Sequence, residues 1–90
     1  MADCRITCIN RSGHGHEHIT YVGSTNWRWP KEDVIRSIDA KTNTFFVIDP
    51  KTGRRADVGV VRPTHGEPYL RTYADGVWND NLLSLYECIQ

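Results

Sequence analysis

The chain has 90 residues, of which 39% are hydrophobic and 24% are charged, and these values are ordinary for one globular domain over residues 1–90. Its 11 basic and 11 acidic residues give a formal net charge of zero, which argues against non-specific binding to nucleic acid or to an anionic membrane. No charged start precedes an apolar stretch and no apolar run approaches the roughly 18 residues that span a bilayer, so we expect a cytoplasmic protein without membrane contact.

The first part of the chain predicts a β-hairpin. Residues 4–10 alternate between two faces as a strand does, and residues 19–22 are rich in the β-branched and aromatic side chains that strands favour. The long, glycine-containing loop between them carries His14 and His16, and His18 stands where the second strand begins.

One short helix follows the hairpin. Pro30 suits its first position, where the missing N–H of proline costs nothing, and the apolar spacing over residues 34–38 gives the helix one buried face. We expect the helix to end near Ala40, with Asn43 in the left-handed conformation that closes such a helix.

The second half of the chain predicts three more strands. Residues 44–48 and 56–62 flank a turn and form a hairpin, and residues 69–73 form the next strand. Residues 77–85 then place apolar side chains around a polar Asn-Asp-Asn kink. The order β-β-α-β-β-β predicts a small α+β fold, with one mostly antiparallel sheet and one short helix packed on one face.

The chain contains three cysteines, Cys4, Cys8 and Cys88, and this odd number disfavours the disulfide framework of a secreted protein. We interpret them as reduced, buried side chains that act as small hydrophobes. A bridge from Cys88 to Cys8 or to Cys4, which would join the two ends of the chain, is the alternative.

Five runs of the sequence point to one family, and they cover residues 5–10, 16–23 (HEHITYVG), 43–49, 55–61 and 71–85. With these runs the chain resembles the small bacterial family known as domain of unknown function 3892, and its segment ADGVWNDNLL is very specific. The family motif ends in Leu-Pro-Glu-Cys, whereas Tyr86 stands in place of the proline here. The resemblance implies a fold neighbourhood, and it implies no activity and no catalytic residue.

Three histidines, His14, His16 and His18, alternate along the hairpin loop. On extended backbone, neighbouring members lie about 6.6–6.8 Å apart and can share a metal ion. Their spacing matches no standard zinc motif, and the glycines beside them make a mobile loop that loses entropy on binding. We therefore interpret them as exposed or hydrogen-bonded loop side chains, with a small zinc-binding domain as the alternative. Further ligands for a metal would come from Cys8, His65 or Cys88.

Acidic and amide side chains gather around Trp78 near the end of the chain. Such oxygen-rich clusters bind calcium or magnesium, but the spacing of a calcium loop is missing. We interpret these side chains as turn caps that bond to their own backbone, with Trp78 anchoring the kink in the core. The same turn is able to form one wall of a pocket. The cluster consists of Asp75, Asn79, Asp80 and Asn81.

Aromatic and basic side chains form a third candidate site, a stacking platform for a base or a nucleotide. A mononucleotide or another small anion needs only two or three such groups. We favour the alternative interpretation, in which the tryptophans lock the start of the helix onto the sheet and the arginines are solvated. The platform would comprise Trp27, Arg28, Trp29, Tyr69, Arg71 and Tyr73, with Arg54, Arg55 and Arg62 for the phosphate.

The sequence contains no complete catalytic set. Cys8 with His16 and Glu17 resembles a thiol–imidazole pair, but the arrangement matches no nucleophile motif. We therefore expect a protein without catalytic activity and without a cofactor.

These observations predict a non-catalytic binding or interaction module. Its site would form where the His14–His18 loop approaches the Trp78–Asn81 tail, and its partner would be a protein or a small polar ligand rather than nucleic acid. Besides the zinc-binding domain, the alternative is an inhibitor or adaptor that covers a larger protein, and an open sheet edge permits a homodimer. The predicted binding residues are His16, Glu17, His18, Trp27, Arg71, Trp78, Asn79 and Asp80.

Overall fold

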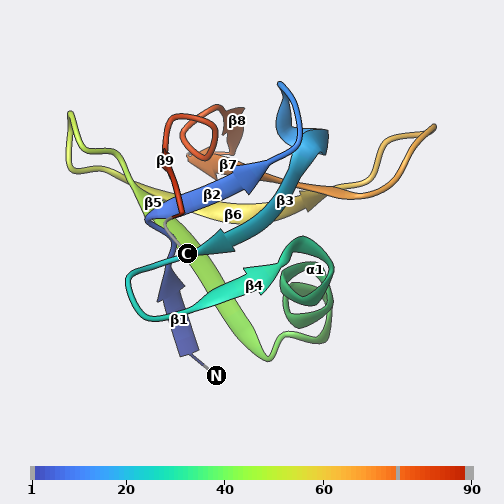
Figure 1. The fold of residues 1–90 in the computed structure, drawn as a ribbon, viewed down its shortest axis with the longest axis horizontal. Coiled ribbons are helices and arrows are strands. Elements are labelled where there is room, and N and C mark those ends of the chain that lie inside the picture. The colour runs from blue at the N-terminus through green and yellow to red at the C-terminus, as the bar shows by residue number, and fades with distance from the viewer. Residues whose placement is uncertain (1, 75, 89–90) are drawn as a thin grey trace.

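The described part of the chain forms two sheets and one α-helix (Figure 1). The structure is a computed structural model that describes residues 2–74 and 76–88. Within these residues the elements follow in the order β1 (Ala2–Arg5), β2 (Cys8–Arg11), the 3-10 helix η1 (His16–His18), β3 (Ile19–Gly23), β4 (Arg28–Pro30), α1 (Lys31–Ala40), β5 (Asn43–Ile48), β6 (Arg55–Val61), β7 (Tyr69–Ala74), β8 (Val77–Asn79) and β9 (Tyr86–Glu87).

Each sheet contains one parallel pair of strands among antiparallel neighbours. The larger, five-stranded sheet has the order β1-β5-β6-β7-β8, with β1 parallel to β5. The smaller, four-stranded sheet has the order β4-β3-β2-β9, with β2 parallel to β9. The predicted α+β class and the mostly antiparallel pairing are confirmed. The sequence predicted a single sheet, and the structure divides the strands between two.

The division arises in the first predicted strand. Residues 4–10 contribute to two short strands, β1 and β2, which belong to different sheets. The amide of Ile6 donates to the carbonyl of Phe46 in the larger sheet, whereas the amide of Thr7 donates to Gly23 in the smaller one. The chain thus crosses between the sheets at this point, and Ile6 at the crossing is only 1% exposed.

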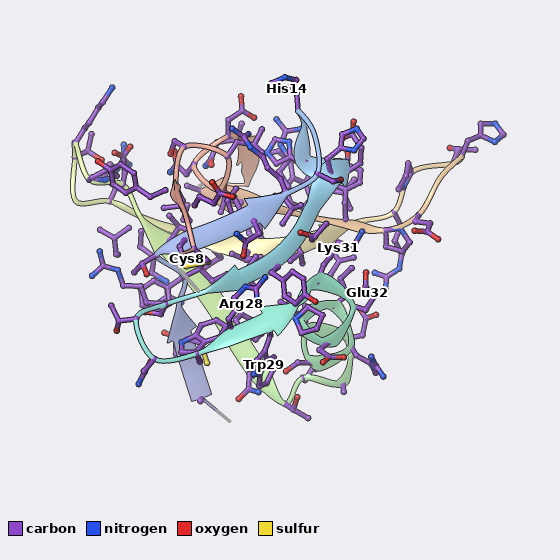
Figure 2. All side chains as sticks on the ribbon, in the orientation of Figure 1. Cys8, His14, Arg28, Trp29, Lys31 and Glu32 are labelled. Atoms are coloured by element: carbon purple, nitrogen blue, oxygen red, sulfur yellow. A yellow bond between two sulfur atoms is a disulfide. The ribbon has the colours of Figure 1, made fainter. Side chains whose placement is uncertain are left out.

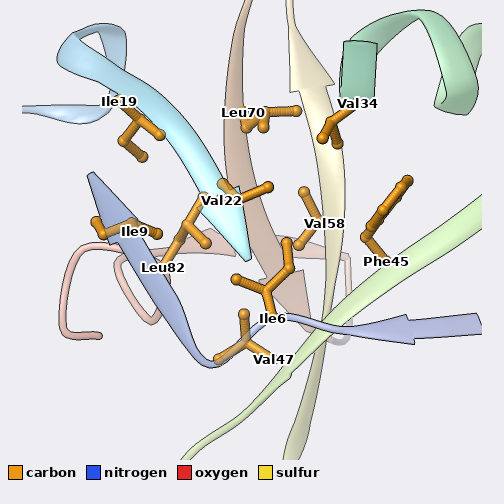
Figure 3. Packing of buried hydrophobic residues seen from close by; sticks show 10 residues of the cluster. All are labelled: Ile6, Ile9, Ile19, Val22, Val34, Phe45, Val47, Val58, Leu70 and Leu82. Carbon is orange, nitrogen blue, oxygen red and sulfur yellow. The ribbon is translucent and has the colours of Figure 1, made fainter. Parts of the chain in front are cut away.

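The hydrophobic core lies between the two sheets and α1 (Figure 3). Inward side chains come from strands of both sheets, from α1 and from the segment after β8. The helix packs against β5 of the larger sheet and against β3 and β4 of the smaller one. The core residues are Ile6, Ile9, Ile19, Val22, Val34, Phe45, Val47, Val58, Leu70 and Leu82.

The helix α1 begins one residue later than predicted, because Pro30 still belongs to β4. It ends at Ala40 as predicted. The residue in the left-handed conformation is Lys41, with φ 57°, and the prediction that Asn43 adopts it is wrong. Asn43 instead begins β5, where its side chain accepts a hydrogen bond from the amide of Ala2. No helix in the described residues has the length and apolar character that crossing a bilayer requires.

A disulfide joins Cys8 of β2 to Cys88, 80 positions later in the sequence. Strand β9 adds to β2 in parallel, and the amide of Cys88 donates to the carbonyl of Ile9 at 3.0 Å, which brings the two cysteines together. The interpretation of all three cysteines as reduced is therefore wrong for this pair, and Cys4 is free. Spacing could not select between the two candidate bridges, because β9 has only two residues and gives no strand pattern.

Candidate functional site

The segment between β2 and β3 forms a hydrogen-bonded turn around η1. Gly15 enters the turn with φ 92°, a conformation that glycine adopts readily and other residues avoid. The amide of Ser12 donates to the carbonyl of His18 at 2.9 Å and closes the turn. The three histidines differ in exposure: His16 is buried, whereas His14 lies exposed at the outer tip (Figure 2).

His16 lies in η1, which packs against β7 of the larger sheet. Its ring stacks on that of Tyr69, with the ring centres 6.3 Å apart and the planes 27° from parallel. Only 8% of His16 is exposed, yet within the described residues its Nε2 atom has no hydrogen-bond partner. Leaving a buried polar atom unpaired costs about 1–3 kcal/mol, so this nitrogen requires an explanation.

A carboxylate from the tail faces that nitrogen. The Oδ1 atom of Asp80, just beyond β8, lies 3.6 Å from His16 Nε2, which is too long for a hydrogen bond. The same oxygen accepts a hydrogen bond from Nη2 of Arg71 at 3.1 Å, and Arg71 Nε donates to the carbonyl of Asn79 at 3.2 Å. The Asp80 side chain is 72% exposed, so an imidazole, a guanidinium and a carboxylate meet at the surface.

A buried hydroxyl holds the tail in this position. Thr72, which is fully buried on β7, donates from Oγ1 to Oδ1 of Asn79 at 2.5 Å and accepts from the amide of Leu82 at 3.3 Å. Asn79 Oδ1 also accepts from the amide of Asn81 at 3.0 Å, as the turn-capping interpretation predicts. The turn that presents Asp80 is therefore tied to β7.

The surroundings of His16 lower the pKa of its imidazole below the usual value of 6.5. Burial is the largest cause, because it disfavours the charged form, and the guanidinium of Arg71 acts in the same direction. The carboxylates of Asp80 and Glu17 oppose the shift. The ring is therefore neutral near neutral pH, with one nitrogen that donates and one that accepts.

The structure brings part of the predicted binding set together and leaves part of it outside. Glu17 and His18, both in η1, form a pair with each other at 3.7 Å. Trp27 packs against Phe45, with the ring centres 6.1 Å apart, and Trp78 packs against Tyr73 of β7. The residues that meet in the cluster are His16, Arg71, Asn79 and Asp80.

Two residues that contact the cluster, Tyr69 and Thr72, lie outside the predicted binding set. Thr72 falls on the same side of β7 as the buried Leu70, so a threonine at an inward position was the available signal. A buried hydroxyl needs a hydrogen-bond partner, and here the tail provides it. The contact of Tyr69 with His16 depends on where η1 packs, which has no signal in the sequence.

The metal and nucleophile sites considered from the sequence do not form in the described part of the chain. No group of three or more His, Cys, Asp or Glu in that part is placed to hold a metal ion. Cys8 is bonded to Cys88 and has no thiolate to pair with His16. Asp75, a member of the predicted acidic cluster, lies outside the described residues.

The predicted stacking platform is divided among several parts of the fold. Trp27 and Trp29 pack around Phe45 and join the start of the helix to the core, as the alternative interpretation predicts. The guanidinium of Arg28 lies over the ring of Tyr21, 3.9 Å from its centre. Another group of its members, Arg54, Arg55 and Tyr73, lines one cavity.

The sequence matches the profile of one protein family. This family is described as "Protein of unknown function (DUF3892)", and the match covers residues 5–86, which include His16, Arg71 and Asp80. No curated protein and no solved structure matches the chain. The chain belongs to the DUF3892 family.

Proposed function

We propose that this protein is a non-catalytic binding module that captures an anionic group of a small polar ligand at the cluster of His16, Arg71 and Asp80. The observation that carries the proposal is the buried Nε2 of His16. This atom faces Asp80 and has no hydrogen-bond partner in the described residues. Buried polar atoms in folded proteins nearly always have a partner, and a bound ligand would supply the missing one.

Arg71 supplies the positive charge of the site. A guanidinium presents a planar fork of donors that fits a carboxylate or a phosphate with two parallel hydrogen bonds. In the free protein Arg71 uses Nε for the carbonyl of Asn79 and Nη2 for Asp80. The anion of the ligand would take the place of Asp80 on Nη2 and would reach Nε2 of His16 as well.

Asp80 occupies the place of the ligand in the free protein. One oxygen of its exposed carboxylate serves both neighbours, at 3.1 Å from Arg71 and 3.6 Å from His16. An exposed ion pair of this kind contributes only about 0–1 kcal/mol, so an incoming anion displaces it at small cost. The backbone of the turn keeps its position during this exchange, because Thr72 and Asn79 hold it.

Titration of isotope-labelled protein with acetate and with inorganic phosphate, followed by NMR, tests the proposal. The backbone amide signals of His16, Arg71 and Asp80 should shift on addition of either anion. Asp80→Asn removes the competing charge but keeps the side-chain shape, so it should raise the affinity about tenfold, which equals about 1.4 kcal/mol. Arg71→Gln removes the positive charge and should lower the affinity by about tenfold or more.

The matched control is Asp39→Asn. Asp39 forms an exposed ion pair with Arg62 and has no hydrogen bond or ion pair with a cluster residue in the described part of the chain, so this substitution should leave the anion affinity unchanged. If Asp80→Asn and Arg71→Gln also leave it unchanged, the cluster only holds the fold together and the proposal is wrong.

The two other hypotheses predict different experimental results. A zinc-binding domain would carry stoichiometric zinc when purified without a histidine tag. An inhibitor or adaptor would form a stable complex with a larger protein in a pull-down and would show no affinity for small anions. No observation in the described residues favours either of them over the anion site.

A further inference from the structure

The face of the larger sheet that points away from the core carries a row of charged and aromatic residues. Along β5 and β6 the sequence neighbours of this row are buried, and α1 contributes to the core and so lies on the other face. Cross-strand pairing places side by side one residue from each strand, namely Arg5, Phe46, Asp57, Tyr73 and Trp78.

The larger sheet opens into a fork beside this row. β5 pairs with β6 only over residues 46–48, so residues 43–45 diverge from β6 and run toward the end of α1 (Figure 1). A cavity of about 390 Å³ lies in the fork, and this volume is within the usual range of small-molecule sites. Its apolar lining comes from Ile38, Phe45 and Val58, and its polar lining includes Lys41, Asp57 and Tyr73.

A second cavity adjoins the first. It measures about 380 Å³, shares Arg55, Asp57 and Tyr73 with the cavity in the fork, and adds Arg54. A ligand on this face would therefore find an apolar compartment in the fork and a polar compartment beside the arginines.

Two exposed aromatic rings stand beside the cavities. Tyr73 is 37% exposed and Trp78 is 43% exposed, and their rings meet edge to face with centres 5.3 Å apart. Gly59 makes this arrangement possible, because a Cβ atom there would lie 3.0 Å from the ring of Tyr73 and 3.2 Å from that of Trp78. Exposed aromatic rings on an open sheet face are suited to stacking with a planar ligand.

Two cations that line the cavities, Arg55 and Lys41, differ in their partners. Arg55 is held by two carboxylates, with Nη1 2.7 Å from Asp3 and Nε 2.9 Å from Asp57. Lys41 is exposed, and its side chain makes no hydrogen bond or ion pair within the described residues. The ammonium of Lys41 is therefore available to an anionic group of a ligand.

We propose that this open face binds a nucleotide, with the base in the fork against Tyr73 and the phosphate on Lys41. Oδ1 of Asp57 accepts a hydrogen bond from Arg55, so Oδ2 remains to accept one from an amino group of the base. A nucleotide combines a planar ring, amino groups and a phosphate, and thus matches the exposed ring, the carboxylate oxygen and the ammonium. The site shares no residue with the anion cluster, so the two proposals are independent.

Isothermal titration with adenosine monophosphate, adenosine and inorganic phosphate tests this inference. The monophosphate should bind about tenfold more tightly than either fragment, because only the monophosphate reaches both the fork and Lys41. Equal affinities for the monophosphate and for inorganic phosphate would overturn the inference, since the base would then contribute nothing.

Lys41→Asn removes the charge and introduces a residue that tolerates the left-handed backbone at φ 57°. It should weaken binding of the monophosphate about tenfold and leave binding of adenosine unchanged. The matched control is Lys51→Asn, because Lys51 is exposed in the turn between β5 and β6 and lines neither cavity. Equal losses in the two variants would mean that only the net charge of the protein matters, and the site would be refuted.

Tyr73→Leu removes the stacking ring and should lower the affinities for the monophosphate and for adenosine alike, whereas Tyr73→Phe should preserve both affinities. Loss of monophosphate binding in Arg71→Gln but not in Lys41→Asn would refute this site and assign the phosphate to the anion cluster. Tight binding of a single-stranded oligonucleotide without binding of the monophosphate would refute it in favour of a nucleic-acid surface.

Discussion

At the residue scale, His16 makes the stability of the protein depend on pH. Burial and the nearby Arg71 lower the pKa of its imidazole, so on acidification the unfolded chain takes up this proton before the folded protein does. The contribution of His16 should be fully present above about pH 7 and should be lost as the pH falls through 6.5 toward the folded pKa. Urea denaturation between about pH 8 and pH 5 measures the resulting slope.

His16→Gln removes the titrating ring and should flatten this slope. His14→Gln is the control, because His14 is exposed at the tip of the turn, and it should leave the slope unchanged. A slope that persists in His16→Gln would assign the pH dependence to another group. The charged and titratable groups that face His16 are Arg71 and Tyr69 on β7, Asp80 in the tail and Glu17 in η1.

The polar members of the anion cluster could be predicted from the sequence, but the tryptophan beside them could not be placed. Asn79 pairs with the inward Thr72, whereas Trp78 pairs with the outward Tyr73. Sequence neighbours on a strand point to opposite faces, so the tryptophan and the amide do not line the same site. Strand β8 has only three residues, which is too few for its alternation to be read from the sequence.

At the element scale, β3 and β4 approach each other closely at Gly23. A Cβ atom there would lie 2.5 Å from the carbonyl oxygen of Trp27 and 3.1 Å from Cα of Arg28, and these backbone atoms cannot move without shifting β4. Gly23→Ala should therefore lower the free energy of unfolding by about 3 kcal/mol, the upper end of the usual cost of overpacking. Thermal denaturation of the variant measures this loss.

Gly59→Ala is the comparison for that substitution. The added Cβ would meet the ring of Tyr73 at 3.0 Å and that of Trp78 at 3.2 Å, and these exposed side chains can turn away. The loss of stability should be clearly smaller than for Gly23→Ala. Equal losses would show that the rings on the open face are as rigid as the backbone of β4.

One buried hydroxyl on β7 bonds to the tail at two points. Thr72→Val keeps the side-chain shape but leaves Asn79 Oδ1 and the amide of Leu82 without this partner. The free energy of unfolding should fall by about 1–3 kcal/mol, as denaturation with urea would show. Thr20→Val on β3 is the control, because the hydroxyl of Thr20 has no hydrogen bond in the described residues and its loss should cost much less.

The predicted elements were correct where the pattern is local. The hairpin of β5 and β6 and the helix α1 follow from alternation and from amphipathic spacing within one segment. Strands β4, β8 and β9 have two or three residues each and exist because a longer strand pairs with them. Such short strands are defined by tertiary pairing, which propensities within one segment do not encode.

At the scale of the whole molecule, the two ends of the chain complete the two sheets. Strand β1 adds to β5 as the edge of the larger sheet, and β9 adds to β2 as the edge of the smaller one. Both additions are parallel pairings between distant segments, such as Ala2 with Asn43 and Cys8 with Tyr86. Such pairings between distant segments leave no pattern within one segment, so the strands at these two edges could not be placed from the sequence.

The Cys8–Cys88 bridge should supply much of the stability of this closed arrangement. Its cysteines are 80 positions apart, so the cross-link restricts most of the unfolded chain. Removing such a bridge typically costs about 2–5 kcal/mol, and the double variant Cys8→Ser, Cys88→Ser should lose stability in that range. Cys4→Ser, which changes the free cysteine, should lower the free energy of unfolding far less. Equal losses of stability would show that the bridge does not form in solution.

The redox state of this bridge bears on the location of the protein and on its anion binding. Cytoplasmic proteins are kept reduced, so the bridge conflicts with the cytoplasmic location expected from the sequence, and alkylation of thiols in intact cells would show which state exists there.

Asp80 is placed by Thr72 and Asn79 rather than by β9. A reductant should therefore lower the melting temperature while the affinity for inorganic phosphate stays within about twofold. Loss of phosphate binding on reduction would show instead that the anion cluster needs the terminal strand in place.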